Sequence, residues 1–260
     1  MDLQLDGKLA LVTGSTAGIG FAIAEALADE GAQVIVNGRT AKRVEEAMDK
    51  LAGARVLGLP ADLSTAAGAE EAIRRFPDVE ILVNNAGIYE VKPFEQISDA
   101  DWLRLFEVNV MSGIRLSRYY LPRMKERNWG RIVFISSESG VQIPPEMIHY
   151  GMTKSAQLAV SRGMAETTAG TGVTVNAVLP GPTESEAVGG FVENLAAQRG
   201  TDRAAIEAEF FKSVRPSSLL KRFARADEVA AMVAFVCSPL SSATNGAAIR
   251  VDGGVVRSIV

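Results

Sequence analysis

Thr13-Gly14-Ser15-Thr16-Ala17-Gly18-Ile19-Gly20 directly follows the apolar run Leu9–Val12 and opens a helical pattern at Ile19–Asp29. A short apolar run before a glycine-rich turn predicts a buried strand, and the pattern behind the turn predicts an amphipathic helix. Glycines at such a turn let backbone N–H groups approach a pyrophosphate, whose charge the N-terminal end of the helix stabilises. The stretch therefore predicts a dinucleotide-binding unit, with a purely structural turn as the alternative. The turn residues expected at the cofactor are Gly14, Ser15, Thr16, Gly18, Ile19 and Gly20.

The rest of the chain alternates short apolar runs with helical patterns. Most of these runs are continuous, which is typical of strands covered on both faces of a parallel sheet. Strand–helix alternation predicts an α/β fold of the Rossmann type, doubly wound with right-handed crossovers. The expected strands are Leu9–Val12, Val34–Val36, Val56–Leu59, Ile81–Val83, Ile132–Ile135, Val173–Val178 and Ala248–Val251. The expected later helices are Ala41–Leu51, Ala66–Arg75, Asp99–Arg127, Tyr150–Ala169 and Asp227–Cys237.

The chain of 260 residues has no composition break, so we expect a single domain over residues 1–260. One connection, Thr183–Arg222, is far longer than a routine loop. We interpret it as a substrate lid inserted at about residues 183–222. The alternative is a small helical appendage whose phenylalanines only pack on the domain. Its helix-like pieces and their phenylalanines are Glu186–Ala197, Asp202–Lys212, Phe191, Phe210 and Phe211.

The composition disfavours several classes of partner. A formal charge of −4 gives no basic face for nucleic acid, and an acidic surface disfavours anionic membranes. No apolar run approaches the roughly 20 residues that cross a bilayer, and the first residues lack a signal-peptide pattern, so we expect a cytoplasmic protein. The chain has one cysteine, Cys237, and one histidine, His149, so we expect no metal site of the usual zinc type.

The end of the second expected strand bears on the choice of cofactor. Dinucleotide folds often place a carboxylate there for the ribose 2′-hydroxyl, whereas an arginine accommodates a 2′-phosphate. This chain has Asn37-Gly38-Arg39 and no acid, with Lys42 and Arg43 close behind. The pattern favours NADP(H). NAD(H) is possible if Asn37 binds a ribose hydroxyl, and the basic residues can also be solvated charges at a helix start.

Three further stretches stand near the ends of later strands, where open α/β sheets bind ligands. They are Asn84-Asn85-Ala86-Gly87, Ser136-Ser137 and Tyr150-Gly-Met-Thr-Lys154. Tyrosine and lysine four residues apart share one face of a helix. A nearby ammonium favours the phenolate and lowers the pKa of a tyrosine toward a range useful in proton transfer. Ser137 can then hydrogen-bond a substrate oxygen beside the phenol.

Together these motifs resemble the short-chain dehydrogenase/reductase family, including its 3-oxoacyl-ACP reductase-like members, over essentially the whole chain. The order and spacing of Thr13-Gly14-xxx-Gly18-Ile19-Gly20, Asn84-Asn85-Ala86-Gly87, Ser137 and Tyr150-xxx-Lys154 carry the resemblance. Asp62, Asn109, Pro180-Gly181 and Val251-Asp252-Gly253-Gly254 also fit. The resemblance implies a seven-stranded parallel sheet with helices on both faces, and a homotetramer with Asp99–Arg127 and Tyr150–Ala169 at an interface.

By the same resemblance, Tyr150 is the general acid/base, and Lys154 binds the nicotinamide ribose and lowers the Tyr150 pKa. Ser137 orients the carbonyl, and Asn109 supports Lys154 through a water. The remaining implied cofactor contacts are Asp62 and Leu63 at the adenine, Asn85, Ala86 and Gly87 behind the cofactor, and Pro180, Gly181 and Thr183 at the nicotinamide end. One departure is Ala17, because NADP(H) members often carry a basic residue there.

The expected activity is hydride transfer between a nicotinamide and a carbonyl or alcohol substrate, as in a carbonyl reductase or alcohol dehydrogenase. Two substrate classes stay open: a 3-oxoacyl thioester, or a free small ketone, sugar or polyol. A regulatory or scaffolding module without catalysis is the alternative from another class, because a fold alone does not fix a function. Glu138 can meet a polar substrate or pair with a neighbouring base, and His149 is expected to pack or be solvated.

Overall fold

The computed structural model describes residues 1–259 apart from positions 52 and 185, and side chains at 186–188, 191, 192 and 194 lie outside the description. Phe191, one of the expected lid phenylalanines, is among these. Seven parallel strands form one sheet in the order β3-β2-β1-β4-β5-β6-β7. The order reverses between β1 and β4, which is where doubly wound sheets bind ligands. The strands are β1 Leu9–Val12, β2 Gln33–Gly38, β3 Val56–Pro60, β4 Ile81–Asn84, β5 Gly130–Ile135, β6 Val173–Pro180 and β7 Ala248–Val251.

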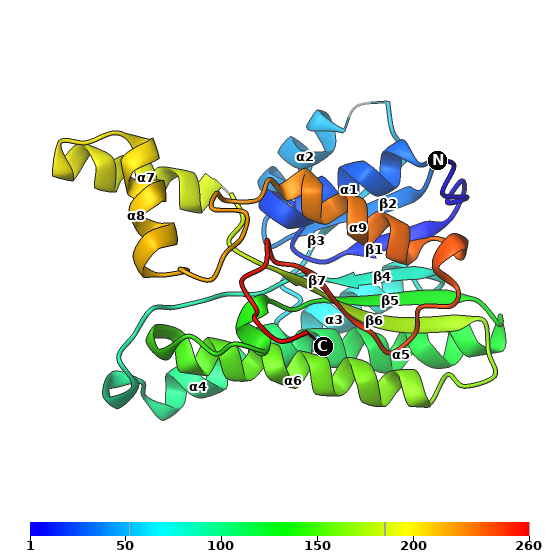
Figure 1. Ribbon diagram of the computed structural model, residues 1–260. Coiled ribbons are helices and arrows are strands. Elements are labelled where there is room, and N and C mark those ends of the chain that lie inside the picture. The colour runs from blue at the N-terminus through cyan, green and yellow to red at the C-terminus, as the bar shows by residue number, and fades with distance from the viewer. Residues whose placement is uncertain (52, 185, 260) are drawn as a thin grey trace.

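Helices cover both faces of the sheet, which confirms the predicted fold (Figure 1). On β1, Ala10 and Val12 belong to one core cluster and Leu11 to the other, because successive side chains point to opposite faces. The first face carries α1 Gly18–Asp29, α2 Ala41–Lys50 and α9 Ala226–Cys237. The second carries α3 Ala66–Arg75, α5 Ser112–Glu126 and α6 Ile148–Glu166.

The expected helix over Asp99–Arg127 is interrupted in the structure. It consists of α4 Asp99–Phe106, a π-helical turn η2 Glu107–Met111, and α5. The apolar pattern runs through the interruption, so the sequence gives no sign of it. Inside the π turn the Asn109 side chain bonds both backbone groups of Ile88, at 2.8 and 2.9 Å. Such turns inside helices frequently mark functional sites.

Between β6 and α9 two helices project from the body of the molecule (Figure 1). They are α7 Glu186–Arg199 and α8 Arg203–Ser213, close to the helix-like pieces expected from the sequence. Asp202 caps α8 by accepting a hydrogen bond from Ala205 N at 2.8 Å. The pair has its own small core, formed with Phe223 beyond α8: Ala196, Ile206, Phe211 and Phe223. The projecting helices therefore have a small core of their own, distinct from the two cores on the sheet.

No described helix is both long enough and apolar enough to cross a membrane. The single cysteine, Cys237, is completely buried at the end of α9. Burial raises the pKa of its thiol to about 12, so the thiol stays protonated and unreactive near neutral pH.

Candidate active site

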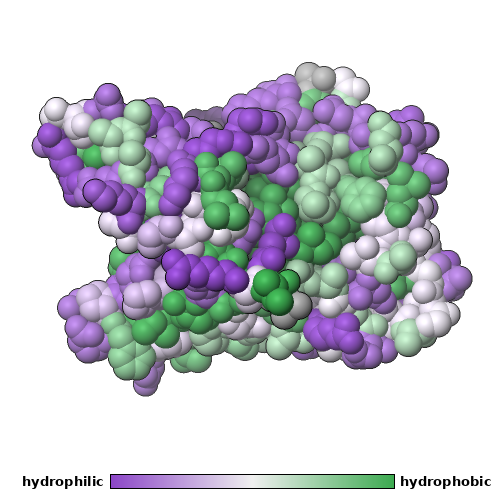
Figure 2. Space-filling model, in the orientation of Figure 1, coloured by the Kyte–Doolittle hydropathy of each residue, from purple (hydrophilic) through white to green (hydrophobic). Residues whose placement is uncertain are grey.

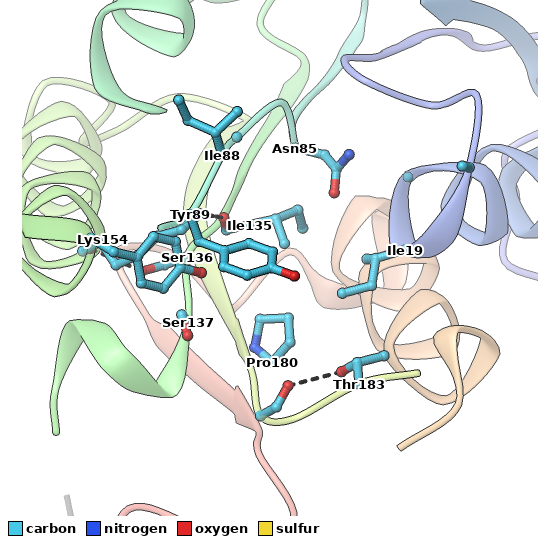
Figure 3. Close-up of a pocket in the computed structure, with 15 residues that line it drawn as sticks. Ile19, Asn85, Ile88, Tyr89, Ile135, Ser136, Ser137, Lys154, Pro180 and Thr183 are labelled. Carbon is cyan, nitrogen blue, oxygen red and sulfur yellow. Dashed lines mark hydrogen bonds between the residues drawn. The ribbon is translucent and has the colours of Figure 1, made fainter. Parts of the chain in front are cut away.

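A cavity of about 330 Å³ lies at the carboxyl ends of the central strands. It brings together the glycine-rich turn, the ends of β4, β5 and β6, and the first turns of α6. Figure 3 shows Lys154 and Ser137 on one side of this cavity and Ile19 on the other, with Asn85 between them. The lining residues are Ala17, Ile19, Gly20, Asn85, Gly87, Ile88, Tyr89, Ile135, Ser136, Ser137, Tyr150, Lys154, Pro180, Gly181 and Thr183. Chain segments far apart in the sequence therefore meet as the motifs predict.

The glycine-rich turn leaves the start of α1 open to an anion. Ala17 is the N-cap residue and offers no side-chain hydrogen bond to the first N–H groups of the helix. Gly14 and Gly18 have φ angles of 63° and 57°, which favour glycine. A Cβ on Gly20 would clash with the Gly14 carbonyl and with the Asn85 amide. The turn is thus packed tightly, with uncapped backbone N–H groups where a pyrophosphate would bind.

The end of β4 is tied to this turn by side-chain hydrogen bonds. Thr13 Oγ1 accepts from Asn85 N at 2.9 Å and from Ala86 N at 2.8 Å. Asn85 Nδ2 donates to the Thr13 and Gly14 carbonyl oxygens at 2.9 and 3.1 Å. Sequence reasoning missed Thr13 as the residue that holds the two loops together. A polar residue at the end of an apolar strand was the available signal.

Asn37 has a structural task that the sequence did not reveal. It is 3% exposed, and its Oδ1 accepts from Gly14 N at 3.0 Å. Its amide nitrogen donates to the carbonyl oxygens of Leu59 and Ala61, both at 3.0 Å. Both amide protons are therefore used within the protein. Arg39 is exposed, and no described residue forms a hydrogen bond or ion pair with it.

The remaining predicted cofactor residues lie outside the cavity. Ser15 is buried, donating to Val12 O at 2.7 Å and accepting from Asn37 N at 2.9 Å. Leu63 is 3% exposed and packs in the core. Asp62 Oδ1 accepts from the Ser64 backbone and hydroxyl, which holds the loop after β3. The adenine contacts implied for Asp62 and Leu63 stay predictions.

Lys154 is held deep in the cavity. Its side chain is buried, and Nζ donates to Ile135 O at 2.8 Å (Figure 3). Burial lowers the pKa of Lys154 to about 7, so its ammonium can lose a proton near neutral pH. Ser136 Oγ donates to the Lys154 carbonyl at 2.9 Å and fixes α6 against the end of β5. The lysine is thus both positioned and poised for proton exchange.

Tyr150 lies beside Lys154, whose Nζ is 5.5 Å from the centre of the phenol ring. Burial raises the pKa of Tyr150 to about 12, although the Ser137 hydroxyl acts to lower it. The phenol is therefore protonated at neutral pH and can donate a proton. The lowering of the Tyr150 pKa expected from Lys154 stays a prediction, because burial dominates in this structure. Ser137 Oγ accepts from Ser139 N at 3.1 Å, so its own proton can be donated to Tyr150 or to a ligand.

Asn109 lies in the π turn, near Lys154. Its Nδ2 also donates to Thr153 Oγ1 at 3.0 Å, and Gln157 Nε2 donates to its main-chain carbonyl at 2.6 Å. Gln157 is 1% exposed, and its Oε1 has no partner among the described residues. Sequence reasoning missed Gln157. Its position three residues after Lys154, on the same helix face, was the signal that could have found it.

A second, larger cavity of about 560 Å³ adjoins the first. Both are lined by Tyr89, Ser137, Tyr150, Gly181 and Thr183. The far wall of the second cavity comes from α7, α8 and the residues behind them. In the space-filling view the surface is indented between the α7–α8 part and the α4–α6 part (Figure 2). Ser137 and Tyr150 therefore stand between a space beside the glycine turn and a space beneath the projecting helices.

His149 does not enter either cavity. It is completely buried, and its ring lies 5.8 Å from the Trp102 ring in an edge-on arrangement. Burial lowers the pKa of His149, so the imidazole is neutral near pH 7. Its role is packing, in agreement with the sequence interpretation.

Comparison with known proteins agrees with this geometry. The model of the family described as short chain dehydrogenase matches residues 8–196. An uncharacterized oxidoreductase, YvrD of Bacillus subtilis, is 49% identical over the full length of both chains. The 3-oxoacyl-[acyl-carrier-protein] reductase FabG of Aquifex aeolicus is 35% identical, covering 98% of this chain and 100% of the relative. The structure of L-sorbose reductase from Gluconobacter frateurii, with NADPH and L-sorbose, superposes with a TM-score of 0.92 at 32% identity and full coverage of both chains.

Proposed function

This chain belongs to the short-chain dehydrogenase family of oxidoreductases, and we propose that it transfers a hydride between NADP(H) and a carbonyl or alcohol substrate. The observation that supports this most is the meeting of Ser137, Tyr150 and Lys154 at one cavity that also reaches the glycine turn. An inactive regulatory or scaffolding module would have no use for this arrangement.

The residues present fit a nicotinamide dinucleotide. The start of α1 has uncapped N–H groups for the pyrophosphate. A Cβ on Gly87 would lie 3.4 Å from Asn109 Oδ1 and 3.7 Å from Lys154 Nζ, so glycine keeps that wall of the cavity open. Pro180, Gly181 and Thr183 form the opposite wall, where Thr183 Oγ1 donates to the Gly181 carbonyl at 2.9 Å (Figure 3). When bound, NADPH would supply the hydride to the carbonyl carbon.

The chain itself supplies the proton and the orientation. Ser137 donates its hydroxyl proton as a hydrogen bond to the carbonyl oxygen and holds it beside Tyr150. Tyr150, protonated at neutral pH, transfers its proton to that oxygen as the carbon is reduced. Lys154, with a pKa near 7, returns a proton toward the phenolate. Asn109 supports Lys154 from the π turn, by way of a water, as the family resemblance implies.

We assign NADP(H) as the favoured cofactor because of what the end of β2 offers. Asn37 already uses both amide protons, so it has no free donor for a ribose hydroxyl. Arg39 is exposed and unpaired among the described residues, and a guanidinium suits a 2′-phosphate. NAD(H) remains the second candidate, since Ala17 gives no basic residue inside the turn.

The experiment for this proposal is a fluorescence titration of the purified protein with NADPH and with NADH. We expect tighter binding of NADPH, with the preference lost in Arg39→Ala. Lys42→Ala is the matched control, because Lys42 already pairs with Glu46 at 3.8 Å. Equal or tighter binding of NADH would contradict the cofactor assignment. Reduction of a panel of ketones, followed through consumption of the preferred cofactor, then tests the activity.

Assembly and location also remain proposals. We propose a homotetramer with α4, α5 and α6 at an interface. The exposed Phe94 and Leu103, at 60% and 69%, support an apolar contact near α4. Light scattering on the purified protein would show a mass of four chains, whereas a monomer would contradict the proposal. The cytoplasmic location stays a prediction.

A further inference from the structure

A buried ionic cluster lies between the projecting helices and the catalytic side chains. Arg215, two residues beyond α8, is only 9% exposed. Its Nε donates to Glu138 Oε1 at 3.0 Å, and its Nη1 donates to Glu146 Oε1 at 3.1 Å. Burial acts against the charge, but Glu138 and Glu146 raise the pKa of Arg215 overall, so the guanidinium is charged. One cation is therefore shared by two carboxylates.

The position of this cluster makes it part of the substrate space. Glu138 directly follows Ser137 and is itself buried at 4% exposure. Glu138, Glu146 and Arg215 all line the larger cavity, together with Ser137 and Tyr150. A substrate whose carbonyl oxygen meets Ser137 and Tyr150 must place its other groups beside this cluster. The charges of the cluster will thus act on whatever the substrate carries there.

The described lining holds three glutamates and two arginines, and each arginine already faces a carboxylate. The outer pair is Arg199 and Glu209, whose Nη1 and Oε2 are 2.7 Å apart. No lysine appears among the described lining residues. A substrate carboxylate would find no unpaired cation here, and it would meet excess negative charge in a partly buried site, where repulsion is screened little.

The rest of the described wall is largely apolar. Side chains beneath the projecting helices present hydrocarbon and aromatic surface to the cavity. They are Leu195, Ile206, Phe210, Val214 and Phe223, faced by Tyr89, Val91 and Met147. Ligand sites of this kind bind through apolar contact and use a few polar groups for selection.

We propose that the substrate is an uncharged carbonyl compound with an apolar substituent, and that the Glu138–Arg215–Glu146 cluster excludes substrates with a carboxylate next to the reacting carbonyl. The inference rests on the proposed hydride transfer and narrows its substrate class. The proposal predicts that free keto acids are not substrates. It favours an apolar ketone or an uncharged 3-oxoacyl ester or thioester over a polyol.

The test compares two compounds that share a carbon skeleton around the ketone. Ethyl acetoacetate is uncharged, and acetoacetate carries the carboxylate. With NADPH, we expect the ester to have a kcat/KM at least about tenfold higher, mostly through KM, which corresponds to one unfavourable charge contact in a partly buried site. Equal or better use of acetoacetate would overturn the proposal.

Variants of the cluster make the test specific. Glu146→Gln should lower the ratio of kcat/KM for ethyl acetoacetate to that for acetoacetate. The Glu146 side chain lies at the rim of the larger cavity, and without its carboxylate Arg215 has one carboxylate partner. The double variant Glu138→Gln/Glu146→Gln should lower this ratio at least about tenfold, because the Arg215 guanidinium is then free to bind an anion. Glu166→Gln, which removes an exposed carboxylate of the Arg162–Glu166 pair outside the lining of both cavities, should change the ratio less than about twofold. An unchanged ratio in a folded Glu146→Gln protein would overturn the proposal.

Binding separates this inference from the proposed function. The affinities of both compounds for the Tyr150→Phe protein loaded with NADPH would be measured by calorimetry. Tighter binding of the ester, with no turnover in the unaltered protein, would support charge exclusion and defeat the proposed activity. Turnover of acetoacetate in preference to the ester would support the proposed activity and overturn charge exclusion.

Discussion

The two cavities that meet at Ser137 and Tyr150 are built in different ways. The wall near the glycine turn consists of backbone held by short side chains, such as Thr13 bonding the Asn85 and Ala86 amides. The wall beneath α7 and α8 consists of long side chains from residues far apart in the sequence, such as Met147 and Phe210. Backbone loops of fixed shape suit a cofactor common to a family. Side chains on a separate pair of helices can change without disturbing the sheet, which suits the choice of substrate.

The largest expected effect on cofactor binding comes from a change in the wall near the glycine turn. In Gly20→Ala the new Cβ would clash with the Gly14 carbonyl, which is main chain and cannot move aside cheaply. We expect NADPH to bind about 10- to 100-fold more weakly, as measured by fluorescence titration. Gly163→Ala is the control, because a Cβ there meets no atom within 4 Å. Unchanged affinity in Gly20→Ala would mean that this close packing does not shape the cofactor site.

A smaller effect is expected behind the lysine. Gln157→Leu removes the donor to the Asn109 carbonyl, a buried hydrogen bond of 2.6 Å. We expect kcat to fall about tenfold because the π turn behind Lys154 loses its support, while NADPH affinity stays within about twofold. Ser161→Ala, on the next turn of α6, is the matched control. An equal fall in both variants would indicate general loss of packing rather than positioning.

A change in the wall beneath α7 and α8 should affect substrate binding alone. Phe210→Ala removes a ring packed against Phe211 and Phe223, each with centroids 5.1 Å away. We expect KM for a bulky apolar ketone to rise about five- to tenfold, with kcat and NADPH affinity nearly unchanged. Lys212→Ala, an exposed position on α8, is the control. A higher dissociation constant for NADPH instead would contradict the assignment of one wall to the cofactor and the other to the substrate. It would also contradict the interpretation of residues 183–222 as a substrate lid.

The smallest expected effect is a shift in pH dependence. The Glu138 carboxylate raises the pKa of Tyr150, since a negative charge disfavours the phenolate. Glu138→Gln should therefore lower that pKa. In the proposed mechanism, alcohol oxidation needs the phenolate and rises with pH, so its profile should move to lower pH by less than about one unit. The pH dependence of kcat for oxidation measures this, with Glu166→Gln, outside the lining of both cavities, as control. A move to higher pH would contradict the sign of the interaction.

The same contrast explains what could be predicted from the sequence. The strands and the glycine turn are local patterns, so Leu9–Val12 and Ala248–Val251 were predicted to the residue. The π turn at Glu107–Met111 was not predicted because it leaves the apolar period almost unchanged. Asn37 looked like a ligand residue, but its bonds to Leu59 and Ala61 depend on strand pairing. The pairing of Glu138 with Arg215, separated by 77 positions, needs the whole fold.

We propose that Tyr150 donates the proton to the carbonyl oxygen while NADPH supplies the hydride to the carbonyl carbon. The most direct test measures NADPH-dependent ketone reduction and NADPH affinity in Tyr150→Phe, a variant that removes only the phenol hydroxyl. We predict that turnover falls by about 10²- to 10⁴-fold and that the affinity for NADPH stays within about twofold. Substantial turnover in the variant would contradict the role of Tyr150, because the proton would then come from another group.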